Sequence, residues 1–253
     1  MVISANTLFH FTKDFATLLS ILKTKFYPKL CKERCLWEKS EDFIFAVPMV
    51  CFCDIPLSCI SEHAAKYGGY AIGLKKSWAI SQGVSPILYV HDNSLFINQC
   101  KEAFCWAVDL AQKDGSRSPE RLSKVLSMFF MMKQYEGYQI IKGNKEKIRF
   151  YDEREWRYIP PIFDKKLILD KKLNFLHMCD FADQTNWDLL NKNNEQYGVS
   201  FNPDVINYII VEQETEINTL IQELRKIESH FPYESVELLT TRIISMERIR
   251  EDF

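Results

Sequence analysis

The sequence predicts an α+β domain, in which strands and helices follow one another without strict alternation. Two observations carry this prediction. Short apolar runs rich in β-branched and aromatic residues, such as residues 43–53 and 205–211, have the length and composition of strands. Other segments repeat apolar residues every three or four positions, as helices do. The 253 residues suffice for one large domain, residues 1–253, with a mainly helical insertion at about 92–136.

The N-terminal elements follow from local patterns. Residues 7–11 (TLFHF) predict a strand, and Thr12 or Asp14 is placed to cap a helix whose apolar residues recur at helical spacing. Residues 43–57 form a strand-rich apolar run. Pro48 within that run indicates an edge strand or a break, because proline cannot donate to a sheet ladder.

The middle of the chain predicts a short helix, two strands and then helices. Gly68 and Gly69 are expected to end the short helix. Residues 70–76 (YAIGLKK) and 86–90 (PILYV) have strand composition. The helical pattern then continues to about Tyr135, with an interruption at residues 114–120.

The C-terminal part returns to strands before and after one helix. Residues 147–151 (KIRFY) and 154–160 (REWRYIP) predict strands. Residues 204–228 predict a strand followed by an amphipathic helix. Residues 235–244 (SVELLTTRII) predict a strand or a short strand-like ending.

Overall charge and hydropathy exclude several classes of protein. The formal net charge of -2 gives no support to general attraction to nucleic acids or membranes, although a local basic patch is compatible with it. No window approaches the ~18 apolar residues of a membrane span. The start, MVISANTLFHF, lacks the basic and apolar regions of a signal peptide. We therefore expect a cytoplasmic protein with reduced thiols.

The cysteines do not have the spacing of a zinc site. Cys31 and Cys35 are separated by three residues, and Cys51 and Cys53 by one. Neither pair is followed by a second CxxC or by a paired histidine motif. Cysteine also serves as a small buried apolar side chain. We expect that role, and no metal.

The segment DEREW, residues 152–156, is the first candidate site. On a strand, alternate side chains share one face, so Glu153, Glu155 and Arg157 would point the same way. Two neighbouring carboxylates suit base or electrostatic roles, including stabilisation of an oxocarbenium ion at a sugar carbon. Alternatively, the arginine pairs with a glutamate in a purely structural ladder.

His10 is the second candidate. On a strand it would face the same way as Leu8 and Thr12, and an imidazole beside a hydroxyl can hydrogen-bond a ribose or phosphate oxygen. The alternative is a histidine at the edge of the core whose hydrogen bond is made to the backbone.

Several segments resemble one family of phage-defence proteins. The run VPMVCFCDIPLS, followed by YGGYAIGLKKSWAISQGVSPILYV and later by FYDEREWRYIP, is similar to the abortive-infection AbiGi family, whose members are described as antitoxins. The resemblance runs in order from residue 7 to about 160, and INYIIVEQETEINTLIQEL resembles the C-terminal part of the family. It implies a bacterial phage-defence protein with a cognate toxin as partner.

A more remote resemblance concerns fold. A strand with a histidine, a helix, the strand VCFCDIP and a later glutamate strand follow the order seen in ADP-ribosyltransferase-like proteins. That resemblance implies a split mixed β-sheet with flanking helices, and a His–Tyr–Glu set around NAD. His10 matches the first position, with Thr12 beside it. Glu155 or Glu153 matches the last. The tyrosine is open between Tyr67 and Tyr70, and a degenerate site without chemistry is also compatible with this order.

Two functions therefore follow from the sequence. The first is an antitoxin that restrains a toxin by contact, through the helices of residues 92–136 or through the C-terminal helix. The second is an ADP-ribosyltransferase-like enzyme that uses NAD to modify a protein or a nucleic acid. The second requires His10, a tyrosine and Glu155 to line one cleft.

Overall fold

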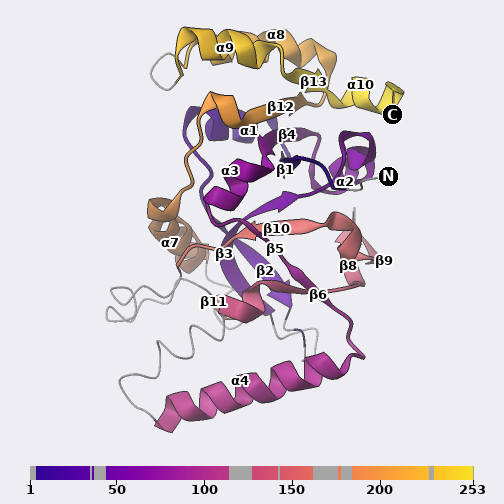
Figure 1. Ribbon diagram of the computed structural model, residues 1–253, viewed down its shortest axis with the longest axis vertical. Coiled ribbons are helices and arrows are strands. Elements are labelled where there is room, and N and C mark those ends of the chain that lie inside the picture. Colours follow the sequence, from indigo (N-terminus) through magenta and orange to yellow (C-terminus); the bar gives the residue numbers. More distant parts are fainter. Residues whose placement is uncertain are drawn as a thin grey trace.

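The computed structural model describes residues 4–34, 36, 44–113, 127–141, 143–161, 176–177, 184–227 and 231–252. Its centre is a mixed β-sheet with the strand order β13-β12-β4-β1-β3-β10-β5, and β2 and β11 also pair with β3 (Figure 1). The strands are β1 (Thr7–Thr12), β2 (Lys29–Arg34), β3 (Ile44–Cys53), β4 (Tyr70–Lys75), β5 (Ser85–Pro86), β10 (Glu155–Tyr158), β11 (Leu176–His177), β12 (Ile206–Val211) and β13 (Ile243–Ser245). Within this described sheet, β12 and β13 pair in parallel and the other pairs are antiparallel.

The sheet divides between β1 and β3. β1 pairs with β4 along its whole length, but it pairs with β3 only where Phe9 lies opposite Cys53. β10 also pairs at Cys53 and therefore lies along the other edge of β3. We call β13-β12-β4-β1 the first half-sheet, and β3 with β10, β5, β2 and β11 the second half-sheet. Beyond the contact of Phe9 and Cys53, no further pairing joins β1 to β3 within the described residues.

Helices cover both faces of the first half-sheet. α1 (Phe15–Lys23), α8 (Ile217–Arg225) and α9 (Tyr233–Thr240) pack on the face that carries Ile72 and Leu74. α2 (Ile60–Tyr67) and α10 (Met246–Asp252) pack on the face that carries Ala71 and Ile210. Alternate residues of β4 thus enter different cores, as the two-residue period of a strand requires. Of these helices, α1, α2 and α8 lie in segments that were predicted to be helical, whereas α10 was not predicted.

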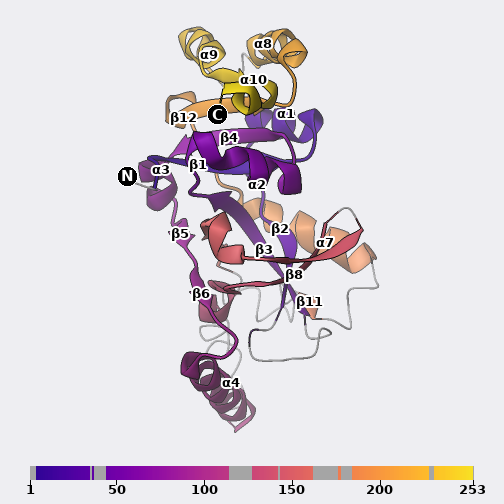
Figure 2. The same cartoon turned by 90° about the vertical axis from the view of Figure 1, so that its right-hand side faces the viewer.

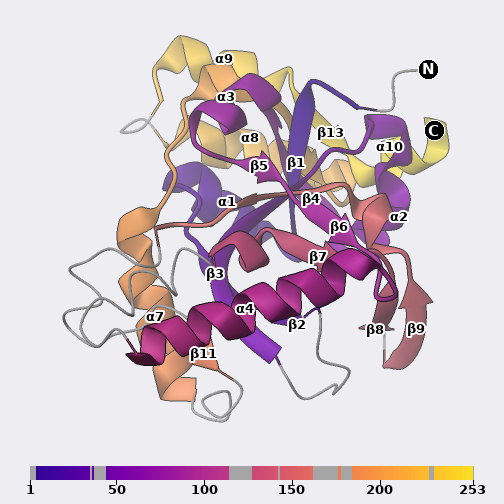
Figure 3. The same cartoon turned by 60° about the horizontal axis from the view of Figure 1, so that its bottom comes forward.

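α3 (Lys76–Ser81) packs against β1 and β4 of the first half-sheet, where Ala79 enters the same core as Leu8. The elements that lie around the second half-sheet or beyond it are β6 (Leu88–Val90), α4 (Leu95–Lys113), β7 (Met132–Gln134), β8 (Gly137–Ile141), β9 (Asn144–Ile148) and α7 (Gln184–Asn194). Figures 1 and 2 show α4 at the opposite end of the molecule from α8 and α9, and Figure 3 shows it crossing in front of β2 and β3. No helix in the described part of the chain has the length and apolar character needed to cross a membrane.

Two predicted helix ends are confirmed. Asp14, rather than Thr12, caps α1, because its carboxylate accepts the backbone N–H of Thr17 at 2.8 Å. Gly68 ends α2 with a φ of 118°, a conformation that glycine adopts without strain. A side chain there would also collide with the backbone of Thr12. The turn therefore brings α2 close against β1.

Pro48 does not break β3, so of the two predicted alternatives, an edge strand or a break, the break is wrong. The strand continues from Ile44 to Cys53, and Leu30 of β2 lies opposite Pro48. On the other edge of β3, pairing with β10 stops at Val50 and pairing with β11 resumes at Ala46. Among the described residues Pro48 lies in that gap, where a residue without an N–H donor leaves no ladder bond unmade.

The strand predicted through DEREW is also corrected. Residues Phe150–Glu153 form a short 3-10 helix, and Arg154 has a left-handed backbone with φ 47° and ψ 50°. β10 begins only at Glu155. Glu153 therefore does not share a strand face with Glu155 and Arg157.

Other differences concern polar segments and segment ends. β2 and α3 were not predicted, because their charged or polar residues hide the apolar period. β8, with the sequence GYQII, was not predicted either. Within the predicted helical insertion, α4 is helical, whereas β7 is a strand that pairs in parallel with β6. Of the predicted strand at 235–244, the first six residues belong to α9 and only the end forms β13. The interruption predicted at 114–120 lies outside the described residues.

Candidate functional site

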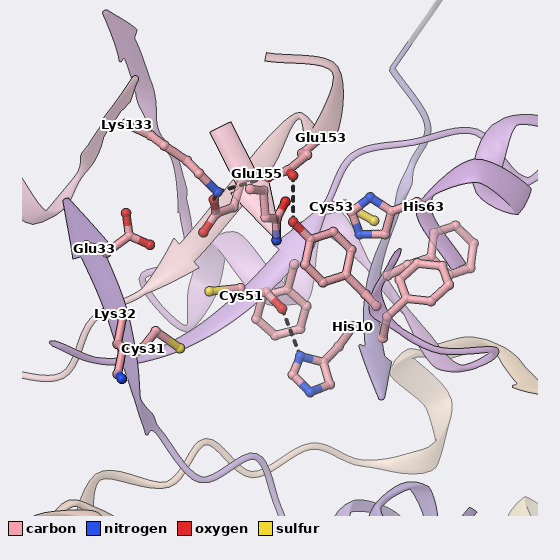
Figure 4. Close-up of a pocket in the computed structure, with 15 residues that line it drawn as sticks. His10, Cys31, Lys32, Glu33, Cys51, Cys53, His63, Lys133, Glu153 and Glu155 are labelled. Carbon is pink, nitrogen blue, oxygen red and sulfur yellow. Dashed lines mark hydrogen bonds and ion pairs between the residues drawn. The ribbon is translucent and has the colours of Figure 1, made fainter. Parts of the chain in front are cut away.

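A cavity of about 280 Å³ lies where the two half-sheets separate (Figure 4). Strands β1, β2, β3, β7, β8 and β10, helix α2 and the turn before β10 all contribute to its wall. Its lining includes Phe9, His10, Phe11, Cys31, Lys32, Glu33, Cys51, Phe52, Cys53, His63, Tyr67, Lys133, Gln139, Glu153 and Glu155. The divided sheet thus produces a hollow with both apolar and charged walls.

His10 lies in the gap between β1 and β3. Its Nδ1 is 2.8 Å from the carbonyl oxygen of Cys51, so Nδ1 carries the proton and donates. The ring also packs edge-on against Phe26, with ring centroids 5.1 Å apart. Burial lowers the pKa of His10 below its ordinary value, although the bond to Cys51 opposes the shift. The neutral ring therefore has Nε2 as an acceptor.

Tyr67 and His63 enter the cavity from one face of α2, four residues apart. Their ring centroids lie 4.5 Å apart, and His63 also packs against Phe11 at 4.9 Å. Burial, together with the nearby Lys66 and Lys133, lowers the pKa of His63 to about 4. Burial and the charge of Glu153 raise the pKa of Tyr67, so its hydroxyl stays protonated. That hydroxyl donates to Glu153 Oε1 at 2.5 Å, which fixes the tyrosine ring.

Lys133 joins the two glutamates of the cluster. Its Nζ lies 2.9 Å from Glu153 Oε2 and 2.9 Å from Glu155 Oε2. It also lies 4.8 Å from the centre of the Phe150 ring. Burial alone would lower the pKa of Lys133, but Glu155, Glu33 and Glu153 raise it well above its ordinary value. Glu153 thus reaches the cluster from its 3-10 turn through this lysine.

Arg157 is fully buried and holds Glu155 by two bonds. Its Nε donates to Glu155 Oε1 at 2.6 Å, and Nη2 donates to Oε2 at 3.2 Å. The same guanidinium donates to the carbonyl of Phe130 at 2.7 Å and pairs with Glu33 at 3.0 Å. The backbone N–H of Glu155 donates to the Tyr89 hydroxyl at 2.8 Å. The position of Glu155 is therefore fixed at both its backbone and its side chain.

These contacts define what Glu155 can do chemically. Burial alone would raise its pKa, but Arg157 and Lys133 lower it to about 2. A carboxylate with so low a pKa stays ionised near neutral pH and is a weak base. It is suited to stabilising positive charge that develops on a ligand. Electrostatic stabilisation, rather than proton abstraction, is the chemistry this geometry favours.

The structure brings together four of the six predicted site residues. His10, Tyr67, Glu153 and Glu155 line the cavity. Thr12 and Tyr70 do not. The Tyr70 hydroxyl donates to Glu216 at 2.8 Å, and its ring packs on Phe15. Of the two candidate tyrosines, only Tyr67 reaches the cavity.

Sequence reasoning missed Lys133, His63 and Glu33. Lys133 lies in a segment predicted to be helical, and nothing local marks it. Glu33 lies on β2, a strand that was not predicted. His63 precedes Tyr67 by one helical turn, so helical spacing from a candidate tyrosine was the available signal.

Comparisons with known proteins complete the description of the site. Residues 24–212 match the family described as "Putative abortive phage resistance protein AbiGi, antitoxin". The match covers more than half of the chain. The chain belongs to the AbiGi family. A curated relative, "Abortive phage resistance protein AbiGi" of Lactococcus lactis subsp. cremoris, is 27% identical over an alignment of 227 residues, and the alignment covers 82% of this chain and 89% of the relative.

Membership of the AbiGi family confirms the resemblance stated from the sequence and places the chain among abortive-infection phage-resistance proteins. The matched range includes Tyr67, Lys133, Glu153 and Glu155, whereas His10 lies before it. No solved structure matched the chain. The ADP-ribosyltransferase-like fold and the NAD site therefore stay predictions.

Proposed function

We propose that this AbiGi protein acts in abortive infection as an antitoxin that restrains a cognate toxin by direct contact. The single observation that carries the proposal is the family description, which contains the word antitoxin and applies to residues 24–212. The relative aligns over 89% of its own length, so the relationship covers nearly the whole architecture and not one motif.

Co-expression tests this role. The neighbouring gene product is expressed alone and together with this chain in a bacterial host. We expect growth arrest in the first case and recovered growth in the second, with the two proteins co-purifying. A neighbouring product that is harmless alone, or equally toxic in the presence of this chain, would refute the antitoxin role.

One specific observation favours a second function, ADP-ribosyltransferase-like chemistry on NAD. His10, Tyr67 and Glu155 come from three separate elements, yet all three line one cavity where the sheet divides. Together they supply a hydrogen-bond acceptor for a ribose hydroxyl, an aromatic ring for a nicotinamide and a fixed negative charge. A purely structural pairing of Glu155 with Arg157 would not require His10 and Tyr67 to lie in the same cavity.

The proposed chemistry follows from the charge on Glu155. Cleavage of the bond between nicotinamide and ribose sends the bonding electron pair to the nicotinamide nitrogen and leaves positive charge at the anomeric carbon. A carboxylate held ionised by Arg157 and Lys133 stabilises that charge. An acceptor nucleophile on a protein or a nucleic acid then forms the new bond and loses its proton.

Calorimetry of the ligand-free protein with NAD tests this function. We expect measurable heat of binding at millimolar NAD, and release of nicotinamide when an acceptor is supplied. If the wild-type protein gives no heat at that concentration, the NAD proposal is abandoned and the antitoxin proposal stands unaffected.

A further inference from the structure

Asp54 lies directly after β3, at the point where the two half-sheets meet. Cys53, the last residue of β3, pairs with Phe9 of β1 on one side and with Glu155 of β10 on the other. His10 follows Phe9 on β1, so His10 and Glu155 stand on strands that both meet β3 at this residue. The separation between these two side chains therefore depends on the contacts that hold the chain at this junction.

The carboxylate of Asp54 is buried and binds two segments of the first half-sheet. The residue exposes 4% of its surface. Just before β1, the backbone N–H of Ala5 donates to Asp54 Oδ1 at 3.1 Å, and the hydroxyl of Ser4 donates to Oδ2 at 2.7 Å. Just after β4, Lys76 Nζ lies 2.9 Å from Oδ1 and donates to Ser4 Oγ at 2.6 Å. The carboxylate thus fixes the start of β1 against the end of β4.

Asp54 also holds the turn that leads into β10 of the second half-sheet. Its backbone N–H donates to the carbonyl oxygen of Arg154 at 3.0 Å, and its Oδ2 lies 3.8 Å from Arg154 Nη2. Lys76 Nζ, the partner of Asp54, lies 5.4 Å from the centre of the Trp156 ring on β10. Asp54 and Lys76 together therefore join β10 to the first half-sheet.

The backbone of Arg154 shows why this turn needs support. Its φ of 47° and ψ of 50° are left-handed, a conformation that residues other than glycine adopt only at an energetic cost. Such conformations persist where surrounding contacts hold them, and they are concentrated at functional sites. The turn at Arg154 lets both Glu153 and Glu155 reach Lys133. The contacts of Asp54 thus act on the residue that sets the direction of Glu155.

An amide could not replace the carboxylate of Asp54. The groups that the described contacts place around Oδ1 and Oδ2 are all donors, namely the Ser4 hydroxyl, the Ala5 N–H, the Lys76 ammonium and the Arg154 guanidinium. Asparagine would turn its own N–H₂ toward one of these donors and would remove the negative charge between two cations. Asp54→Asn therefore keeps the size of the side chain and disrupts the contacts that depend on its charge.

We propose that Asp54 is a positioning residue that fixes Glu155 relative to His10 by joining the two half-sheets at Cys53. The inference rests on the proposed NAD function, because it assigns Asp54 a role in the same reaction. Asp54 is not among the described residues that line the first cavity, so it acts through Glu155 and does not touch the ligand. Misplacement of a reacting group by about 1 Å can cost about 10²-fold in rate, even when the substitution lies away from the chemistry.

Steady-state kinetics of nicotinamide release from NAD test this role. We expect Asp54→Asn to lower kcat by roughly 10- to 100-fold, because the carboxylate of Glu155 no longer faces the developing charge. Lys76→Met, which keeps the carboxylate but removes one of its cations, is expected to act in the same direction with a smaller loss. Melting temperatures identify the variants that fold, and Lys76→Met takes the same measurements if Asp54→Asn does not fold.

Glu223→Gln is the matched control for these variants. Glu223 also pairs with two cations, Lys23 at 2.8 Å and Lys226 at 2.7 Å, and it also joins two elements, α1 and α8. Both elements lie on the first half-sheet, away from the cavity. We expect kcat in Glu223→Gln to equal that of the wild-type protein.

A double-mutant cycle separates positioning from a general loss of structure. If Asp54 acts through the carboxylate of Glu155, Asp54→Asn changes kcat by at most about twofold in a Glu155→Gln background, because the group that it positions is already gone. A merely structural role predicts the same fractional loss in both backgrounds.

Amide hydrogen exchange of the ligand-free protein, followed by mass spectrometry, tests the junction without NAD. We expect Asp54→Asn to raise exchange at least about fivefold in peptides that cover residues 150–158, because the turn opens locally once its support is removed. Peptides from β12 are expected to exchange as in the wild-type protein, since β12 lies within the first half-sheet.

The outcomes distinguish this inference from the function on which it rests. Absence of NAD turnover in the wild-type protein refutes the NAD proposal, and with it a role of Asp54 in that reaction. Where the wild-type protein turns over NAD, three results refute the inference alone: an unchanged kcat in a folded Asp54→Asn or Lys76→Met variant, an equal loss in the Glu155→Gln background, or unchanged exchange in residues 150–158.

Discussion

The two half-sheets bury their interiors in opposite ways. In the first half-sheet the fully buried side chains are aliphatic, and Leu8, Ile72, Leu74 and Ile209 each expose 0% of their surface. In the second half-sheet the largest fully buried side chain is Arg157, also at 0%, with Glu155 at 7% and Glu153 at 4% near it, beside small apolar residues of β3 such as Ala46 and Val47. The first half is held by apolar contact, and the second adds to its apolar contacts a cluster of buried charges that must be paired.

This difference separates stability from function. Aliphatic burial contributes roughly 25 cal/mol per Å² and places no demand on geometry beyond packing. A buried ion cluster contributes little net stability, because each ion loses its hydration, and replacing such a cluster by apolar residues is often neutral or stabilising. Perturbed ionisable groups beside a cavity are therefore more often a functional feature than a stabilising one. The charged half-sheet is where we place the chemistry.

The largest expected effect comes from breaking the charged half. Arg157→Met leaves Glu155 and Glu33 without their buried cation, and loss of one partner from a buried pair costs about 3–5 kcal/mol. Urea unfolding followed by circular dichroism measures the change. Arg225→Met is the matched control, because Arg225 forms its ion pair with Glu237 at the exposed surface, and the expected cost is below about 1 kcal/mol.

A parallel substitution in the apolar half sharpens the contrast. Leu74→Ala is expected to cost about 3 kcal/mol through lost burial and a residual void, yet to leave NAD affinity unchanged once the protein is folded. Arg157→Met is expected to lose NAD binding as well. If Arg157→Met lowers the free energy of unfolding by less than 1 kcal/mol, the buried ion cluster does not depend on the pairing of its charges as its geometry indicates.

Glu155→Gln tests the charge itself. The amide keeps the shape of the side chain but removes the negative charge, and loss of one preorganised group at a reacting centre usually costs about 10²–10³ in rate. We expect NAD turnover to fall by that factor, measured as nicotinamide release. Glu153→Gln is the comparison, with a smaller loss, because Glu153 acts through Tyr67 and Lys133. Unchanged turnover in Glu155→Gln would show that the pairing of Glu155 with Arg157 is purely structural.

The charged half also predicts how stability depends on pH. The pKa of Glu155 is about 2 in the folded protein against an ordinary 4.5. Its contribution to the free energy of unfolding is therefore complete above pH 4.5 and is lost as pH falls toward 2. A shift of that size corresponds to roughly 3 kcal/mol. His63, with a pKa of about 4 against 6.5, weakens the fold in a separate window as pH falls from 6.5 to 4.

Urea unfolding at a series of pH values separates these two windows. Glu155→Gln is expected to flatten the dependence below pH 4.5, and His63→Phe the dependence between pH 6.5 and 4. Neither window should change in Leu74→Ala, which lies in the apolar half. Identical pH profiles in wild type and both variants would contradict the assigned pKa shifts.

The apolar half was also the part that the sequence predicted well. Residues 7–11, 70–75 and 205–211 are regular alternating or continuous apolar runs, and each became a strand of the first half-sheet. β2, with the sequence KLCKER, carries charges toward a cavity and has no apolar period to detect. Within the second half-sheet β3 and β10 were predicted from their strand-like runs, whereas β2 escaped pattern analysis because its charged residues hide any apolar period.

The site was predicted where its residues lie on or beside predicted strands, and at Tyr67 on the predicted short helix. His10 and Glu155 lie on predicted strands, and the structure places both in one cavity. Glu153 was assigned to the wrong local structure, since a left-handed residue, Arg154, separates it from β10. It still joins the cluster because Lys133 reaches both glutamates. Such long-range pairing depends on tertiary contact and has no signature in local sequence.

The smallest expected effect concerns His10, at the gap between the two halves. His10→Ala leaves the carbonyl of Cys51 without its donor, which costs about 1 kcal/mol, and removes Nε2 from the cavity. His10→Asn separates these roles, because its amide can donate to Cys51 but has no group in place of Nε2. We expect His10→Asn to recover stability in urea and still bind NAD about tenfold more weakly in calorimetry, the loss of one hydrogen bond. If His10→Asn recovers both, the histidine only joins the half-sheets and does not contact a ligand.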